Sequence, residues 1–126
     1  MMPTFLTKTN FLNEIRELTG NSDLGINMDS PFIDSLKETI NEDDLITKDS
    51  LNGDIDSNIM RQVIGKGGYY FHLTTKNTNC YFIWYSITDN KIYIWGNSES
   101  VSKAKGILNH RLHIVKVRNQ ECNIKM

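Results

Sequence analysis

The chain has 126 residues, 39% of them hydrophobic and 23% charged, with a formal net charge of −1. This length suits one domain with an extension and excludes a large multidomain enzyme, and the composition predicts a folded chain without the ~20-residue apolar run of a membrane span. The two cysteines, Cys80 and Cys122, form no CxxC pair, so we expect no disulfide scaffold and a cytoplasmic or otherwise intracellular protein.

The charge is divided along the chain. Residues 1–59 carry a net charge of −8, whereas residues 60–126 carry +7. A basic half attracts a polyanion, because neutralised phosphates release condensed counterions. Two oppositely charged halves also attract each other, so charge alone does not choose between a nucleic-acid partner and an internal contact.

Residues 1–44 predict an acidic helical extension. Apolar residues at spacings of three and four predict a helix over 10–18, and Gly20 follows as its stop. A polar loop is expected at 21–27. A second helix is expected over 30–40, where Ser30 serves as the cap and proline takes the first helical position.

Residues 45–115 predict an α+β domain. Its expected order is a weak strand within 45–55, a helix, a glycine turn, a helix over 69–77, and a hairpin of two strands followed by a helix. The hairpin strands, 81–85 and 92–95, are rich in β-branched and aromatic residues. We expect a three-stranded antiparallel sheet with helices on one face.

The last predicted helix begins after Gly96, where Ser98 can cap it, and ends near Leu112. His110, Arg111 and His113 would then form its basic end, where cations suit the helix dipole. Residues 116–126 are expected to be a short basic tail.

The glycine turn, Gly65 to Gly68, reads Gly-Lys-Gly-Gly. Glycine permits positive φ angles and a close approach to the backbone, while a helix N-terminus and Lys66 both favour an anion. The turn therefore fits a phosphate group. A tight connection between two helices explains the same residues without any ligand. The spacing is that of neither a P-loop nor a dinucleotide-binding fingerprint.

The segment Met60 to Gly68 resembles the helix and GXXG loop of the K-homology (KH) domain, whose loop clamps the backbone of single-stranded nucleic acid. The resemblance covers about 59–112, and the element order resembles the type I topology. Its further matching residues follow the loop, alternate along a strand, or lie in the last strand and helix: Phe71, Phe82, Trp84, Ile92 to Gly96, Glu99, Val101, Ala104 and Ile107.

This resemblance implies a KH type I-like fold and a non-enzymatic adaptor that binds single-stranded nucleic acid, either RNA, which we favour, or DNA. It implies that the turn holds phosphates, that apolar residues around it line a groove, and that the variable loop at 86–91 adds a contact. Tyrosines at the start of the helix can stack on a base or simply pack. The candidate binding residues are Gly65, Lys66, Gly67, Gly68, Ile64, Val63, Tyr69, Tyr70, Phe71 and Lys91.

The chain also departs from the family pattern. Arg61 stands where a glycine is usual, Thr74 replaces an apolar residue, and Tyr69-Tyr70 replace a basic or small polar pair. An alternative function is therefore a protein-interaction or structural module whose KH-like fold no longer binds nucleic acid.

Both faces of the predicted hairpin carry apolar or aromatic residues, as expected of a sheet that is covered on both sides. We hypothesise that the N-terminal helices cover the face away from the domain's own helices, or that this face contacts a second copy or a protein partner. The acidic extension would alternatively compete with nucleic acid for the basic groove.

The sequence predicts no metal, cofactor or catalytic site. His110, His113 and Cys122 fall short of the four ligands of a closed zinc site. His72 lies near the turn, where it can contact a phosphate or remain solvated. No nucleophile with a base and an orienting group is recognisable, so we expect no enzymatic activity.

Overall fold

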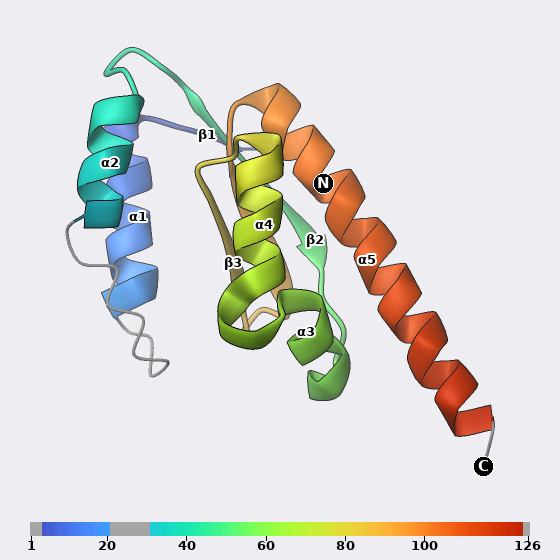
Figure 1. Ribbon diagram of the computed structural model, residues 1–126. Coiled ribbons are helices and arrows are strands. Elements are labelled where there is room, and N and C mark those ends of the chain that lie inside the picture. Colours follow the sequence, from blue (N-terminus) through green and yellow to red (C-terminus); the bar gives the residue numbers. More distant parts are fainter. Residues whose placement is uncertain (1–3, 21–30, 125–126) are drawn as a thin grey trace. The chain divides into compact units, whose positions relative to one another are not determined.

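The computed structural model of the chain describes residues 4–20 and 31–124, without the side chains at 19–20, 31–34 and 121–124. The described residues form two compact units, an N-terminal unit of 4–46 and a C-terminal unit that begins at Thr47. Helices and strands occur in both units, so the protein is α+β, as predicted (Figure 1). No described helix has the length and apolar character needed to cross a membrane.

The N-terminal unit contains β1 (Thr4–Leu6), α1 (Lys8–Gly20) and α2 (Pro31–Thr39). The hydroxyl of Thr7 accepts the amide of Asn10 at 3.2 Å and so caps α1. The ammonium of Lys8 donates to the carbonyl of Lys37 at 2.6 Å, which ties α1 to the end of α2. Both predicted helices are confirmed, whereas β1 was not predicted. The predicted loop at 21–27 and the cap Ser30 lie outside the described residues.

The sheet of the C-terminal unit consists of β2 (Ile46–Asn52), β4 (Lys91–Gly96) and β3 (Phe82–Ser86), in that spatial order, and both pairings are antiparallel. The predicted hairpin is confirmed, and the weak strand within 45–55 is β2. Asn90 adopts a φ of 52° in the hairpin turn, a conformation that Asn tolerates better than most residues. With β1, the described residues contain four strands rather than the three predicted.

Three helices cover one face of this sheet: α3 (Ser57–Ile64), α4 (Tyr69–Thr78) and α5 (Ser98–Ile124) (Figure 1). Alternate residues of β4 point into the core that the helices complete, because successive strand side chains face opposite sides. The core residues come from every one of these helices and from all three strands: Leu51, Ile59, Met60, Val63, Phe71, Cys80, Ile83, Ile92, Ile94, Val101, Ala104, Leu108, Leu112 and Val115.

The opposite face of the hairpin carries the predicted aromatic residues. The ring of Phe82 lies 5.9 Å from that of Trp84 and 5.5 Å from that of Trp95, between centroids. Tyr93 packs beside Trp95, and the ammonium of Lys48 lies 4.7 Å from the Tyr93 ring centroid, within range of a cation–π contact. Which element or partner covers these rings stays a prediction.

The end of α5 differs from the prediction, because the helix runs to Ile124 rather than ending near Leu112. Buried Leu112 and Val115 continue its apolar side, and the ammonium of Lys116 lies 3.4 Å from a carboxylate oxygen of Asp54. These contacts are tertiary, so the local sequence does not reveal them. Consequently His110, Arg111 and His113 lie inside the helix and do not form its basic end.

The start of α5 also corrects a prediction. The side chain of Asn97 accepts the amide of Ser100 at 2.9 Å, so Asn97 rather than Ser98 caps the helix. The Ser98 hydroxyl instead forms a hydrogen bond with the hydroxyl of Thr47 in β2, at 2.9 Å.

Candidate nucleic-acid interface

The glycine turn connects α3 to α4 through backbone conformations that favour glycine. Gly65, Gly67 and Gly68 have φ angles of 84°, 63° and 79°. The amide of Gly65 donates to the carbonyl of Arg61 at 2.8 Å, and the amide of Gly68 donates to the carbonyl of Gly65 at 3.0 Å. The turn is therefore a defined structure with its own hydrogen bonds.

The glycines of this turn differ in their surroundings. A Cβ atom at Gly65 would lie 2.6 Å from Cδ2 of Tyr70, so packing excludes a side chain there. A Cβ atom at Gly67 would meet no heavy atom within 4 Å. Lys66 and Gly67 are both exposed. The backbone at the tip of the turn is thus open to an approaching group, with a lysine ammonium beside it.

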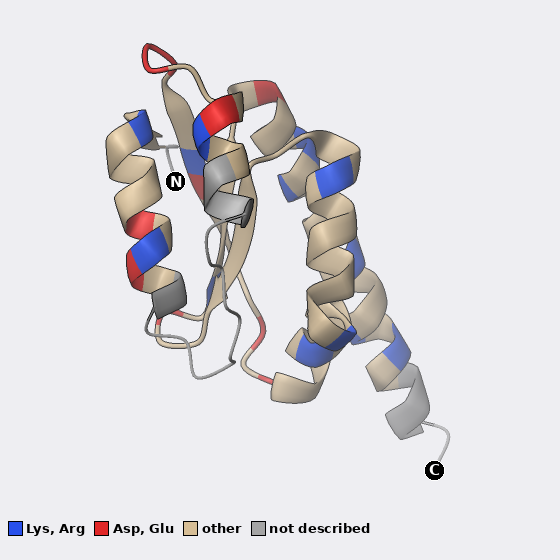
Figure 2. Cartoon of the chain, turned by 60° about the vertical axis from the view of Figure 1, so that its left-hand side comes forward, with Lys and Arg blue, Asp and Glu red and all other residues tan. Residues whose placement is uncertain are grey.

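The electrostatic environment of the turn favours an anion. The segment from Ser57 to Thr88 contains no Asp or Glu, and Arg61, Lys66 and Lys76 lie within it. Figure 2 shows no acidic residue on α3 or α4. The turn leads directly into the N-terminus of the ten-residue helix α4, whose dipole adds a partial positive charge. The imidazole of exposed His72 lies beside Gly68, 3.3 Å from where a Cβ atom would be.

The two tyrosines after the turn have different roles. Tyr69 is 58% exposed, and its ring meets that of Tyr70 edge-on at 5.1 Å. Tyr70 packs instead against Arg111 of α5, whose Cζ atom lies 3.3 Å from the ring centroid. Tyr69 is therefore the tyrosine with free surface. One helical turn further, Leu73 is also exposed, and we call Tyr69 and Leu73 the apolar strip of α4.

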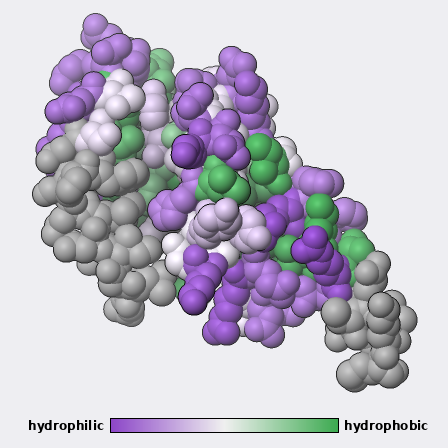
Figure 3. All heavy atoms as spheres, viewed as in Figure 1, coloured by the Kyte–Doolittle hydropathy of each residue, from purple (hydrophilic) through white to green (hydrophobic). Residues whose placement is uncertain are grey.

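Apolar surface on these helices is limited and local. Figure 3 shows green patches between purple residues over α4 and α5. Among the side chains of these two helices that the structure describes, the exposed large apolar ones are Tyr69, Leu73 and Ile107. The apolar strip therefore adjoins the turn within an otherwise largely polar surface.

Arg111 was not among the predicted binding residues. Its Nη2 donates to the carbonyl of Gln62 at 2.7 Å, and its Nε donates to the carbonyl of Val63 at 3.2 Å. The guanidinium thus lies at the C-terminal end of α3, directly before the turn. Because nearly 50 residues separate these partners in the sequence, no local pattern could have revealed the contact.

The predicted apolar residues lie mostly below the surface. Val63 is fully buried and Phe71 is 7% exposed, so both belong to the core. These two side chains support the surface residues around the turn but are not themselves exposed to a ligand. Ile64 is half-buried and packs against the core. Thr74, which replaces an apolar residue, is buried with its hydroxyl donating to the Tyr70 carbonyl at 2.8 Å.

Lys91 is not brought to the turn. It is the first residue of β4 and is opposite Asn52 and Ser86 in the register. Because strand side chains alternate, Lys91 shares the face of Tyr93 and Trp95, away from α3 and α4. The hairpin turn therefore does not supply this predicted phosphate contact beside the glycine turn.

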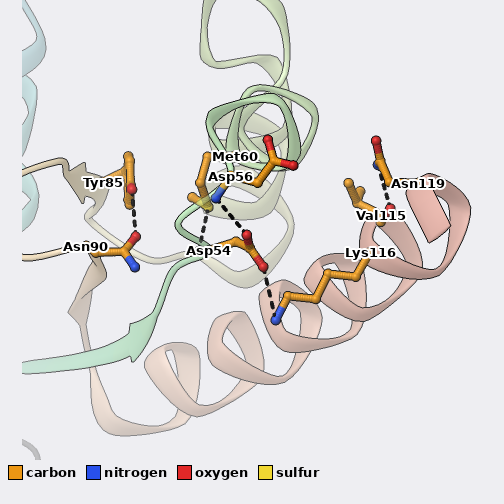
Figure 4. A network of polar contacts seen from close by, with 8 residues as sticks. All are labelled: Asp54, Asp56, Met60, Tyr85, Asn90, Val115, Lys116 and Asn119. Atoms are coloured by element: carbon orange, nitrogen blue, oxygen red, sulfur yellow. Dashed lines mark hydrogen bonds and ion pairs between the residues drawn. The ribbon is translucent and has the colours of Figure 1, made fainter. Parts of the chain in front are cut away.

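The other end of α3 is closed by a network of polar contacts (Figure 4). Asp56 caps α3 by accepting the amide of Asn58 at 2.9 Å, and Asp54 accepts the amide of Asp56 at 2.8 Å. Nearby, the hydroxyl of Tyr85 donates to the side chain of Asn90 at 2.7 Å. Burial raises the pKa of the Tyr85 hydroxyl, and the carboxylate of Asp54 raises it further.

The described residues provide little for covalent or metal chemistry. Burial raises the pKa of the Cys80 thiol, which a hydrogen bond from Thr78 offsets only in part, so Cys80 is a poor nucleophile. No three His, Cys, Asp or Glu side chains among the described residues are placed to hold a metal ion. Cys122 has no described side chain.

Comparisons with protein-family models, curated proteins and solved structures found no match. The geometry of the turn and its surroundings therefore carries the interpretation. That geometry combines an open backbone, a positive electrostatic environment and an adjoining apolar strip.

Proposed function

We propose that the C-terminal unit binds single-stranded nucleic acid, RNA rather than DNA, through the turn Gly65 to Gly68. The observation that carries this proposal is the open tip of the turn, where exposed Lys66 and Gly67 adjoin the N-terminus of α4 in a segment without acids. A phosphate at this position would meet backbone amides, a helix dipole and an ammonium group.

The fold supports a KH type I-like interpretation. The C-terminal unit has the order strand, helix, glycine turn, helix, strand, strand and helix. Its three strands pair antiparallel, and its helices lie on one face. This is the arrangement that the KH resemblance of the sequence implies, and the preference for RNA follows from that resemblance.

The apolar strip favours nucleic acid over a small anion. Tyr69 and Leu73 lie on the helix that begins at the turn, and both are exposed. A ligand with phosphates and flat bases would use the turn and the strip together, and stacking on an aromatic ring tolerates any base. A single GXXG loop holds about four nucleotides, so we expect modest affinity for an adaptor without catalytic activity.

The test is a fluorescence-anisotropy titration of short single-stranded RNA and DNA pools. The variant Lys66→Asp, Gly67→Asp places two carboxylates where a phosphate would lie, and both positions are exposed. Lys76→Asp, Asn77→Asp is the matched control, because it changes the charge equally at two exposed positions near the end of α4. Circular dichroism must show that both variants are folded.

We expect the native chain and the control variant to bind, with RNA preferred, and the turn variant to lose binding. If the turn variant and the control variant bind equally, the affinity depends on general charge, and the turn has a structural role only. If the native chain does not bind either pool, the alternative of a protein-interaction module replaces the proposal.

A further inference from the structure

Arg111 satisfies backbone groups that the glycine turn leaves without helical partners. In a continuing α-helix, the carbonyls of Gln62 and Val63 would accept the amides four residues later, those of Lys66 and Gly67. The chain instead turns at Gly65, and Arg111 donates to both carbonyls at 2.7 and 3.2 Å. The guanidinium therefore replaces the next two amides and satisfies the carbonyls of Gln62 and Val63 at the end of α3.

The same side chain also fixes the start of the next helix. The face of the Arg111 guanidinium lies against the ring of Tyr70, 3.3 Å from Cζ to the centroid. Tyr70 in turn bounds the turn, because its ring and amide are the atoms nearest to a Cβ at Gly65. Arg111 thus contacts both the end of α3 and the start of α4. The glycine turn is the segment that joins these two helices, so Arg111 fixes both of its ends.

We propose that Arg111 is a positioning residue that holds the glycine turn in its ligand-binding shape before any ligand arrives. The inference rests on the proposed function, since it names the residue that prepares the same site. A turn that is already ordered loses less conformational entropy on binding, and this raises affinity without a new contact. Two of the Arg111 donor atoms and its flat face are engaged within the protein, which distinguishes its role from that of Lys66.

Lysine cannot take this role, because an ammonium group lacks the planar fork and the stacking face of a guanidinium. Arg111→Lys therefore retains the charge and removes the geometry. Arg118→Lys is the matched control, since Arg118 is an exposed residue of the same helix and the chemical change is identical. Chemical denaturation of each variant identifies the solution conditions under which both variants are fully folded.

The first measurement is amide hydrogen exchange of the free protein by NMR. In Arg111→Lys we expect the amides of Gly65 and Gly68, which donate within the turn, to exchange roughly tenfold faster, as for the loss of one charge-assisted hydrogen bond. Exchange in Arg118→Lys should be unchanged. Unchanged exchange in Arg111→Lys would overturn the proposal, whether or not the chain binds RNA.

The second measurement is RNA affinity against salt concentration. We expect Arg111→Lys to bind roughly tenfold more weakly, with an unchanged slope of log affinity against log salt, because no phosphate contact is lost. A slope smaller by about one would make Arg111 a direct phosphate contact and contradict a positioning role. Unchanged affinity in the folded variant would also contradict it, because a purely structural residue alters only the folded fraction.

Tyr70 provides a further test of the same unit. Tyr70→Leu removes the ring that Arg111 contacts and should weaken binding about as much as Arg111→Lys. The double variant Arg111→Lys, Tyr70→Leu should be no weaker than either single variant, since the two side chains act together. Additive losses would show that they act separately. Failure of the native chain to bind would refute the proposed function, and hydrogen exchange would still decide whether Arg111 holds the turn.

Discussion

The two ends of α3 differ in how their polar groups are used. At its start, Asp56 caps the helix and Asp54 binds the amide of Asp56 and the ammonium of Lys116. At its end, the turn presents Lys66 and Gly67 to solvent. The first end is closed by contacts within the protein, whereas at the second end Arg111 binds the last carbonyls of α3 and the tip of the turn remains open and positive.

Two glycines show the same difference. A Cβ atom at Gly53 would lie 2.7 Å from the Asn90 side chain and 2.8 Å from the Tyr85 ring, whereas one at Gly67 would meet nothing. Packing therefore explains Gly53, and only the backbone conformation requires glycine at position 67. The open space beside Gly67 is where the proposed phosphate group would lie.

Substitution of these two glycines should give the largest effects on stability. Gly53→Ala forces a methyl group against two side chains that hydrogen-bond to each other, and we expect a loss of about 2 kcal/mol from overpacking. Gly67→Ala should cost about 1 kcal/mol through its positive φ alone. Urea denaturation measures both. A larger loss of stability for Gly67→Ala than for Gly53→Ala would contradict the view that packing constrains Gly53 and leaves Gly67 open.

Removal of the α3 cap should have the next largest effect. Asp56→Ala removes the acceptor for the amide of Asn58, so we expect a loss of about 1 kcal/mol in the free energy of unfolding. Asp56→Asn retains an accepting oxygen and is the control. RNA affinity should be unaltered in both variants. Weaker binding by folded Asp56→Ala would mean that the closed end of α3 also belongs to the site.

At the open end, a substitution should weaken binding without lowering stability. Lys66→Ala removes an exposed side chain, so we expect the free energy of unfolding to change by less than about 0.5 kcal/mol. The slope of log affinity against log salt should fall by about one, since one phosphate contact is lost. A destabilised variant with normal RNA binding would contradict this expectation.

The smallest expected effect is a change in pH dependence at the closed end. The pKa of Tyr85 is raised in the folded protein by burial and by Asp54. The unfolded chain then ionises first, so stability should fall as pH rises above about 10, the ordinary pKa of tyrosine. Asp54→Asn removes one cause, and the fall should be shallower. The raised pKa of Cys80 also lowers stability as pH rises, from about pH 9. This effect is the same in the native chain and in Asp54→Asn, so it cancels when the two are compared.

Denaturant midpoints measured across this alkaline range test the difference. The Asp54→Asn chain should be less stable overall, because it loses the ion pair with Lys116. The informative quantity is therefore the dependence on pH and not the absolute stability. An identical decline in both chains would show that Asp54 does not act on Tyr85.

Local patterns in the sequence predict most of the fold. The hairpin is recognisable because β-branched and aromatic residues fill 81–85 and 92–95 around a turn, and the glycine-rich segment was predicted to join two helices. The strand β1 has only three residues, too few for a periodic pattern. The length of α5 was missed because its residues after Leu112 include tertiary contacts such as that between Lys116 and Asp54.

The candidate site was predictable only in part, for the same reason. Glycine spacing and Lys66 identify the turn, because they follow from local backbone chemistry. The sequence does not distinguish exposed Tyr69 from Tyr70, which packs under Arg111. Nor does it reveal Arg111 at the end of α3, or that Lys91 faces away from the turn. These facts depend on the three-dimensional arrangement of α3, α4, α5 and the sheet.

The central claim is that the open end of α3 binds the backbone of single-stranded RNA. Its most direct test is the anisotropy titration of an RNA pool with the native chain, Lys66→Asp, Gly67→Asp and the control Lys76→Asp, Asn77→Asp, at several salt concentrations. We predict salt-dependent binding by the native chain and the control, and none by the turn variant. Binding by the turn variant equal to that of the control would contradict the claim.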